Sequence, residues 1–438
     1  MSTEKTTLSR RRLLRSAALA GVGLLAAACQ PRVVEKPVKE TVVVEKVVKE
    51  TVAPPTKPAP KPKVSISLCT HDVQTVVDCH ARHIQWFQEQ NPNVQISQVF
   101  YPTKDMVQKL VVGWSAGVGE TVCGIYGPWL PTFVKGGYLD EAPARVLDFL
   151  KQDFFEVNIK GGTINGKPYT IVEEIGCPLP LISKDVWKAA GISEAEYPET
   201  YDQLIALLPR LNQSGMQAVC NMPEGMFQIV NWTTVLLAYG GQVLDDTFTK
   251  AAFNSPAGLD ATKVHRKLSR KDADYKLFLG GKCGMLWFGP WCRPWWTNPN
   301  MPVKVGPPLR GPARRVHANY QWDYVVNAHA SPDQKEAAWD YAMFVSTKQA
   351  QIIFWKEVGH MPRSKSAYED PVLKKDAFLQ SFAQYLPETE NYYAPIAAWE
   401  PVEKTIIAGL ERLTAGEIVE EQFLSETERK VNDILAGK

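Results

Sequence analysis

The feature that most constrains the fold is a regular alternation of strand-like and helix-like segments over residues 64–137. Val64–Leu68 alternates apolar and polar side chains, which is typical of a strand with one buried face. Apolar residues within 74–90 recur instead at helical spacing, and Pro92 ends that segment. The same two patterns then continue through a strand at 94–101, a helix at 103–116, a strand at 121–126 and a short helix at 130–137. Helices that alternate with strands serve as crossovers between parallel strands, so the chain is predicted to be an α/β protein.

A second informative stretch is Gly281–Trp296, which reads GKCGMLWFGPWCRPWW. Its apolar run Met285–Phe288 predicts a buried strand, and Gly289 with Pro290 is expected to end it. Three indoles follow at once: Trp291, Trp295 and Trp296. Such rings either fill a core or line a cavity, and we favour a wall of flat rings that faces a cavity.

Charge excludes one class of partner. From residue 64 onward the chain has 36 Lys and Arg against 42 Asp and Glu, a net charge of −6. A mildly acidic globule lacks the basic surface that nucleic acid requires, so no nucleic-acid partner is expected.

The N-terminus has the pattern of an export signal. A basic segment that contains Arg10 and Arg11 precedes an uncharged run, 16–28, that ends in three alanines before Cys29. This run is too short to cross a bilayer, so 1–28 is predicted to be a signal peptide rather than a buried N-terminal helix. The arginine pair resembles a twin-arginine export signal, and the alanines before the cysteine resemble a lipobox. The implied mature chain begins at a lipidated Cys29 and is anchored to the outer face of the cytoplasmic membrane.

Residues 29–63 are predicted to be a disordered stalk. The ten-residue segment VVEKPVKETV (33–42) is followed by the near copy VVEKVVKETV (43–52), and then by a proline-rich stretch. Two such short units cannot bury a core, and the prolines favour an extended spacer.

The cysteines and histidines leave open a metal site. With Cys29 set aside, seven cysteines allow at most three disulfides, whose pairing the spacing does not reveal. A zinc site is geometrically conceivable near the first predicted helix, but we expect no metal or cofactor because His and Cys there are more often packed or exposed. Its candidate ligands would be Cys69, His71, Cys79, His80 and His83.

The ordered set of later segments resembles the extracellular solute-binding proteins that supply carbohydrate ABC importers, of the maltose-binding-protein type. The resemblance runs from residue 64 to the end, with one departure: the helical passage is compressed at 256–280. The segments that carry it are FQEQNPNVQISQVFYPTKDMVQKLVVGWSAG (87–117), IYGPWLPTFVKGGYLDE (125–141), INGKPYTIVEEIGCPLPLISKDVWKAAGI (164–192), AYGGQVLDD (238–246), FNSP (253–256), GKCGMLWFGPW (281–291), EAAWDYAMFVSTKQAQ (336–351) and GHMPRSKSAYEDP (359–371).

The resemblance implies a two-lobed α/β fold of the periplasmic-binding-protein type II, with a ligand cleft between the lobes. Lobe 1 would comprise 64–173 with 326–385, and lobe 2 would comprise 174–325 with 386–438. The chain would cross between the lobes near 172–177, 323–327 and 385–395.

Sugars present C–H faces that stack on aromatic rings and hydroxyl rims that need hydrogen-bonding groups. Several aromatic residues fall where the family places pocket residues, and acidic residues near the strand ends and crossings are candidate hydroxyl acceptors. The candidate ligand-binding residues are Trp291, Trp129, Tyr126, Trp232, Trp322, Asp323, Trp399, Glu174, Glu173 and Asp72.

These features together predict a monomeric, membrane-tethered lipoprotein that captures a sugar, expected to be an oligosaccharide, and passes it to an ABC permease with its ATPase. An alternative ligand is a glycerol phosphodiester or another small polar solute, for which Arg293 or Arg363 could bind phosphate. We expect no enzyme activity: Glu173 and Glu174 are adjacent on a predicted strand, point to opposite faces and cannot flank one glycosidic bond.

Overall fold

A computed structural model describes residues 62–213, 215–221, 225–269, 273–298 and 300–438, all of which belong to one compact unit. Arg10, Arg11, Cys29 and the predicted stalk up to residue 61 lie outside these described residues. Among the helices of the described part, none has both the length and the apolar character needed to cross a bilayer.

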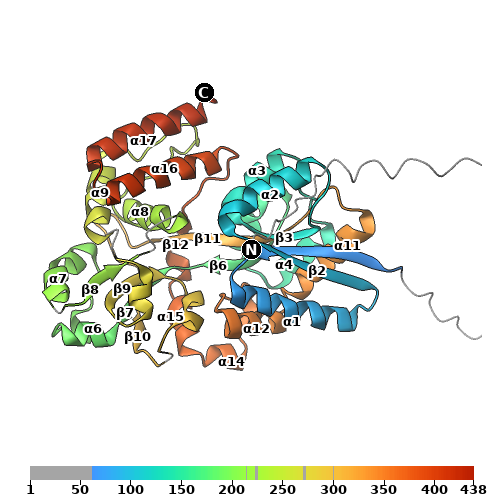
Figure 1. The fold of residues 1–438 in the computed structure, drawn as a ribbon, viewed down its shortest axis with the longest axis horizontal. Coiled ribbons are helices and arrows are strands. Elements are labelled where there is room, and N and C mark those ends of the chain that lie inside the picture. Colours follow the sequence, from blue (N-terminus) through green and yellow to red (C-terminus); the bar gives the residue numbers. More distant parts are fainter. Residues whose placement is uncertain (1–61, 214, 222–224, 270–272, 299) are drawn as a thin grey trace, which may run out of the picture. The chain divides into compact units, whose positions relative to one another are not determined.

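The first of two main sheets follows the predicted alternation (Figure 1). Its strands lie in the order β12-β11-β3-β1-β2, with β6 also paired to β11, and β1 runs parallel to both β2 and β3. Strand β1 continues to His71, beyond the predicted end at Leu68, because it stays paired with β2 as far as Tyr101. The strands are β1 (Val64–His71), β2 (Val94–Tyr101), β3 (Val122–Tyr126), β6 (Ile171–Gly176), β11 (His317–Val326) and β12 (Thr389–Asn391).

Helices of the early and late parts of the chain pack around this sheet, and the predicted helices between residues 74 and 137 are confirmed. Helix α1 buries Val76, Ile84 and Phe87 from the predicted apolar face. These helices are α1 (Gln74–Gln90), α2 (Thr103–Ser115), α3 (Leu130–Lys135), α4 (Ala144–Asp153), α5 (Glu156–Gly161), α11 (Pro332–Phe344) and α12 (Lys348–Val358). The short helices α13 (Lys365–Tyr368), α14 (Pro371–Lys374) and α15 (Ala377–Ala383) follow, and α15 contacts β10 of the second sheet. A short hairpin of β4 (Thr163–Ile164) and β5 (Lys167–Pro168) precedes β6.

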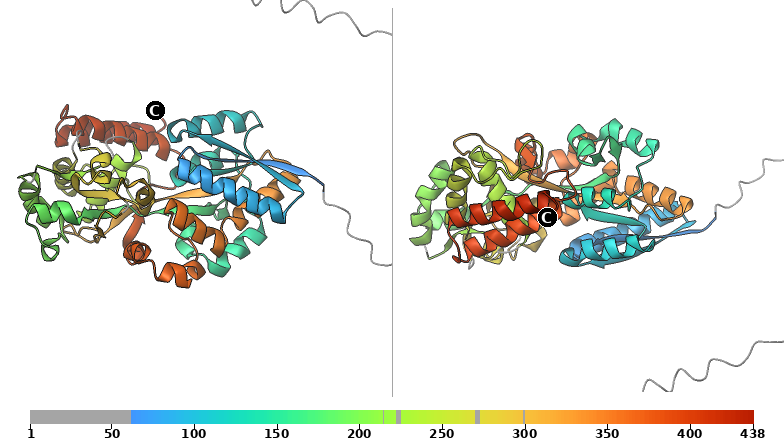
Figure 2. Two further views of the ribbon diagram at one scale, coloured as in Figure 1. Left: turned by 60° about the horizontal axis from the view of Figure 1, so that its bottom comes forward. Right: turned by 90° about the horizontal axis from the view of Figure 1, so that it is seen from above.

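The second main sheet has four strands in the order β10-β7-β9-β8. Strand β9 ends at Phe288 as predicted, and a 3-10 helix, Pro290–Trp295, contains Trp291 and Trp295, with Trp296 directly after it. Helices α16 and α17 lie side by side and pack on α8 and α9 (Figure 2). The elements are β7 (Leu179–Ser183), β8 (Gln217–Cys220), β9 (Cys283–Phe288), β10 (Val303–Val305), α6 (Lys184–Ala189), α7 (Tyr201–Gln213), α8 (Met226–Ala238), α9 (Pro256–Leu268), α10 (Tyr275–Leu279), α16 (Trp399–Thr414) and α17 (Glu420–Leu435).

Strand β11 is the element that brings the site together. It pairs antiparallel with β3 on one side and with β6 on the other. In this register Trp322 lies opposite Tyr126 of β3 and opposite Glu174 of β6. Three of the predicted ligand-binding residues, distant in sequence, are therefore neighbours across one sheet.

The cysteines divide into one disulfide and a group of thiols. Cys220 of β8 and Cys283 of β9 form a disulfide within the second sheet. Five other cysteines of the described chain are buried as free thiols: Cys69, Cys79, Cys123, Cys177 and Cys292. Among the described residues, disulfide cross-linking is thus confined to the second sheet.

Candidate functional site

A cavity of about 560 Å³ lies at the ends of strands from both main sheets. His71 ends β1, Tyr126 ends β3 and Phe288 ends β9, while Tyr320 and Trp322 of β11 cross beneath them, and all five line the cavity. Ligands of open α/β sheets bind in crevices at the carboxyl ends of strands, and pockets of this volume suit small organic ligands.

One side of the cavity is a cluster of rings from the first sheet, the first aromatic wall, made of Tyr126, Trp129 and Trp322. The ring centroids of Tyr126 lie 5.5 Å from those of Trp129 and 5.6 Å from those of Trp322. Trp129 and Trp322 meet edge to face at 5.9 Å. Each ring thus holds the others in place, so the wall is already formed before a ligand arrives.

The second sheet contributes the second aromatic wall. Trp291 packs against Phe288 at 5.5 Å, and Tyr320 lies 5.8 Å from Trp291 and 5.6 Å from Tyr126, so that it connects the two walls. The second aromatic wall consists of Phe227, Tyr275, Phe288, Trp291 and Trp295. Trp296, the third indole of the predicted group, packs instead against Phe378 and does not line the cavity.

Gly289 permits the position of the Trp291 ring. A methyl group at residue 289 would lie 1.7 Å from a carbon of that ring, so Gly289→Ala must displace the indole. We expect the unfolding temperature to fall only modestly, because the φ of −90° at this residue suits alanine, while ligand affinity falls roughly tenfold. Isothermal titration with a ligand that the wild type binds would measure this, and an unchanged affinity would show that the ring position does not matter.

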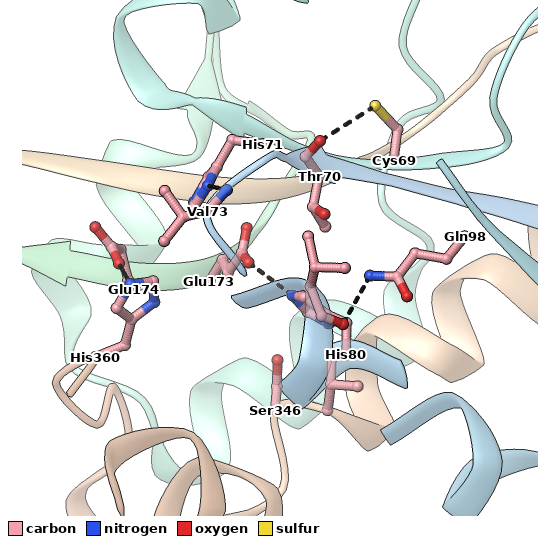
Figure 3. Close-up of polar contacts among 12 residues, drawn as sticks. Cys69, Thr70, His71, Val73, His80, Gln98, Glu173, Glu174, Ser346 and His360 are labelled. Carbon is pink, nitrogen blue, oxygen red and sulfur yellow. Dashed lines mark hydrogen bonds and ion pairs between the residues drawn. The ribbon is translucent and has the colours of Figure 1, made fainter. Parts of the chain in front are cut away.

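A polar group of three residues closes the cavity near β6 (Figure 3). Glu174 Oε2 and His360 Nε2 lie 2.5 Å apart, and both side chains line the cavity. His71 accepts a hydrogen bond from the Val73 N–H at its Nδ1, at 3.4 Å. Burial lowers the pKa of His71, so the ring is neutral at physiological pH and its proton lies on Nε2. The group therefore offers a carboxylate acceptor and an imidazole donor, as sugar hydroxyls require.

Glu173 points to the opposite face of β6, away from this group (Figure 3). Its Oε1 lies 3.1 Å from His80 Nε2, and both side chains are almost wholly buried. Burial by itself would raise the pKa of Glu173, but the hydrogen bond from His80 and the electrostatic interaction with the nearby histidines outweigh it and lower the pKa. The buried guanidinium of Arg363 donates to the Glu173 backbone carbonyl. Glu173 thus belongs to a supporting network behind the cavity.

Helix α16 brings a further carboxylate to the cavity wall. Glu403 is 5 % exposed and lines the cavity, and the Tyr392 hydroxyl donates a hydrogen bond to its Oε1. The Tyr126 hydroxyl lies 2.7 Å from that of Tyr392 and therefore donates to it, since the Tyr392 proton is already directed at Glu403. Burial raises the pKa of Glu403 to about 7, although the bond from Tyr392 acts in the opposite direction.

The raised pKa of Glu403 predicts a pH-dependent effect of Glu403→Gln. Between about pH 4.5 and pH 7 the folded wild type holds a proton that the unfolded chain has released, so its stability falls as pH rises through this window. Glutamine does not titrate. We therefore expect the variant to be more stable than the wild type by about 3 kcal/mol above pH 7 and equal to it near pH 4.5. Urea unfolding at several pH values would measure this, and a constant difference would contradict it.

Four other predicted site residues lie away from the cavity. Trp232 donates to Thr262 Oγ1 at 3.0 Å within the core, and the Trp399 ring is 1 % exposed and packs on Tyr392. Asp323 is fully buried, accepts hydrogen bonds from Thr170 and Gln321, and has a pKa raised to about 7 by burial. Asp72 is exposed and does not line the cavity. With Glu173, half of the ten candidates therefore support the fold or lie at its surface.

The remaining candidates, Tyr126, Trp129, Glu174, Trp291 and Trp322, all line the cavity. Sequence reasoning missed several lining residues. His71 was missed because the strand was predicted to end at Leu68 and the histidine was considered only as a metal ligand. The missed residues are His71, Phe227, Tyr275, Tyr320, His360, Glu400, Glu403 and Lys404. For His360 the sequence signal was its place in GHMPRSKSAYEDP (359–371), a segment that resembles the solute-binding family.

The candidate metal ligands do not form one site. His80 binds Glu173, His71 lines the cavity, and Cys79 packs with Val76 and Phe354. Within the described ranges there is no group of three His, Cys, Asp or Glu side chains placed to hold a metal ion.

The two linked sheets and the aromatic-lined cavity between their strand ends define a ligand-binding protein with a two-lobed α/β fold. Residues 83–380 match the family described as bacterial extracellular solute-binding protein, and the chain belongs to that family, as its sequence segments suggested. A protein of Brucella abortus (strain 2308) named only as a binding protein is 23% identical over 367 residues, covering 80% of this chain and 88% of its own length.

Solved structures confirm the predicted fold class. An ABC transporter solute-binding protein from Thermotoga lettingae TMO, bound to alpha-D-tagatose, aligns with a TM-score of 0.76 at 21% identity and covers 85% of this chain and 100% of its own. Maltose-bound T. maritima MalE3 aligns with a TM-score of 0.76 at 19% identity, covering 84% and 99%. An ABC transporter solute-binding protein from Agrobacterium radiobacter K84, in complex with ribitol, aligns with a TM-score of 0.73 at 19% identity. The alignment covers 85% of this chain and 100% of the other chain.

Proposed function

We propose that this protein is the extracytoplasmic substrate-binding component of an ABC importer and captures a sugar in the aromatic-lined cavity. The observation that carries the proposal is the combination of two aromatic walls with the polar group of His71, Glu174 and His360 in one cavity. Rigid ring faces suit the C–H faces of a pyranose, and the polar group suits its hydroxyl rim. The volume of about 560 Å³ favours a saccharide of two or more units.

Similar structures support a polyhydroxylated ligand. Their bound molecules are alpha-D-tagatose, maltose and ribitol, which are a monosaccharide, a disaccharide and a sugar alcohol. These three ligands share their many hydroxyl groups but differ in type and size. The similar structures therefore support a ligand class and do not select one sugar.

A phosphodiester ligand has less support. Arg293 is half exposed and lies 3.9 Å from Asp376, and Arg363 is buried behind β6, so neither of the two candidate clamps lines the cavity. Lys104 and Lys404 do line it, but both are exposed and Lys404 pairs with Glu400. A buried phosphate would need fixed donors of the arginine type.

We propose that the protein binds and releases its ligand unchanged. A glycosidase needs two carboxyl groups that flank one bond, whereas Glu173 and Glu174 face opposite sides of β6, one bound to His80 and the other to His360.

Export and anchoring complete the proposal. Arg10 and Arg11 would direct export, a lipidated Cys29 would hold the chain at the outer face of the cytoplasmic membrane, and the stalk would let the globule reach its permease. The two lobes would comprise 64–173 with 326–385 and 174–325 with 386–438, and the protein would act as a monomer. Acyl labelling that disappears in Cys29→Ser would test the anchor.

A thermal-shift screen of the purified protein against mono-, di- and trisaccharides tests the function. A ligand that binds the native state selectively raises the unfolding temperature. We expect at least one sugar to do so, with glycerophosphodiesters as the comparison set. The proposal fails if the phosphodiesters stabilise the protein and no sugar does.

A further inference from the structure

The buried part of the cavity wall contains an acidic side chain, Glu403, without a basic side chain to pair with it among the described residues. Glu400 pairs with Lys404 one helical turn away, and Glu174 pairs with His360. Among the described residues no ion pair forms to Glu403. This carboxyl group is 5 % exposed, and its one hydrogen-bond donor in the described chain is the Tyr392 hydroxyl. A buried carboxylate without a cation is costly unless something else neutralises it.

The hydrogen-bond chain beside Glu403 partly offsets the effect of burial and suits its ionised form as an acceptor. Tyr126 donates to Tyr392, and Tyr392 donates to Glu403, so both hydroxyl protons point toward the carboxylate. Successive donors of this kind polarise one another and strengthen the last bond. The Tyr392 hydroxyl binds Oε1 of Glu403. The second carboxyl oxygen of Glu403, Oε2, is therefore left for a group that enters the cavity.

The same hydroxyl chain joins Glu403 to the first aromatic wall. Tyr126 belongs to that wall together with Trp129 and Trp322, at centroid distances of 5.5 and 5.6 Å. The faces of tyrosine and tryptophan attract cations, most strongly where water is excluded. An ionised carboxylate that lines the same cavity as these rings is suited to an ammonium group, which can interact with both, whereas a neutral hydroxyl brings no charge to offset that of Glu403.

We propose that Glu403 binds a protonated amino group of the ligand, so that the substrate class is an amino-substituted saccharide. The inference rests on the proposed sugar-binding function and narrows it. Glu403 then acts as a residue that determines specificity, while the two aromatic walls contact the sugar rings as for any saccharide.

Isothermal titration of the purified protein with matched sugar pairs tests the proposal. The pairs are glucose and glucosamine, galactose and galactosamine, mannose and mannosamine, and cellobiose and its fully deacetylated diamino counterpart chitobiose. We expect the amino sugar of at least one pair to bind roughly tenfold more tightly than its neutral partner. Glu403→Gln keeps the shape and the hydrogen-bonding capacity of the side chain but removes the charge, so it should abolish this preference.

Glu411→Gln is the matched control, because Glu411 lies on the same helix, is exposed and does not line the cavity. It should keep the preference of the wild type. The proposal is overturned if no amino sugar binds more tightly than its neutral partner, or if Glu403→Gln keeps the preference. Sugar binding without any amine preference would refute this inference alone, whereas a failure of all sugars, neutral and amino, would refute the proposed function as well.

Discussion

Trp291→Ala should weaken sugar binding about a hundredfold, the largest effect on binding expected from any single substitution in the cavity. The ring is 7 % exposed, lines the cavity, and is held by Phe288 and Tyr320 at centroid distances of 5.5 and 5.8 Å. Its removal takes away a flat surface for the sugar and also a neighbour that fixes the other rings. Isothermal titration with a sugar that the wild type binds is the measurement.

Two further variants separate stacking from general packing. Trp291→Leu keeps much of the apolar volume but lacks a planar face, so its affinity should fall nearly as far as that of Trp291→Ala. Trp296→Ala removes a neighbouring indole, directly after the 3-10 helix that contains Trp291. The Trp296 ring packs on Phe378 and does not line the cavity. Its sugar affinity should remain within about twofold of the wild type. Equal losses in Trp291→Ala and Trp296→Ala would show that the turn, rather than the ring face, determines binding.

The fold was predictable from the sequence because its signals are local. Alternation with period 2 in 64–68 and helical spacing in 74–90 each depend on a few neighbouring residues, and both elements are present as β1 and α1. The end of β9 was equally local, since Gly289 and Pro290 follow it directly. The extension of β1 to His71 was missed because it depends on pairing with β2, which the residues of β1 do not show.

The site was predictable only in part, since an aromatic residue suits a core as well as a cavity. Trp232 and Trp291 are both almost fully buried, yet Trp232 donates to Thr262 between helices α8 and α9 while Trp291 faces the cavity. What separates them is the position of their elements in space. The connection of Glu403 to Tyr126 through Tyr392 likewise joins residues that are hundreds of positions apart and has no local signature.

Glu173 and Glu174 illustrate the same limit for charged residues. Strand alternation correctly predicts that they face opposite sides of β6, but not which side faces the ligand. The partners decide this: His80, 93 residues away, binds Glu173, while His360 binds Glu174 at the cavity. A carboxylate with a buried partner behind the sheet is part of the structural support, and its loss should affect stability before binding.

His80→Leu should lower the free energy of unfolding by about 3–5 kcal/mol, the largest stability effect that we expect from a polar contact in this protein. The substitution leaves the Glu173 carboxylate buried without its hydrogen-bonding partner at 3.1 Å. A side chain at residue 124 would collide with Glu173 Oε2, so the carboxylate lies close against the Gly124 backbone of β3 and has little room to move in that direction. Urea unfolding measures the loss. Adding Glu173→Gln to this variant removes the unpaired charge and should restore part of the lost stability; a deficit unchanged in the double variant would mean that packing, not charge, is responsible.

The pH dependence of this deficit provides an independent check on the pairing. In the wild type the pKa of Glu173 is lowered below its usual 4.5, so its ionisation adds stability above that pH, and this stability is lost as the pH falls through the lowered pKa. Without His80, burial dominates and raises the pKa above 4.5, so the folded variant binds more protons than its unfolded chain and loses stability as pH rises. The difference between wild type and His80→Leu should therefore be small near pH 4 and widen toward pH 7. A deficit that stays the same across this range would place the cost in lost packing around Phe354 and Tyr324, the rings that surround His80.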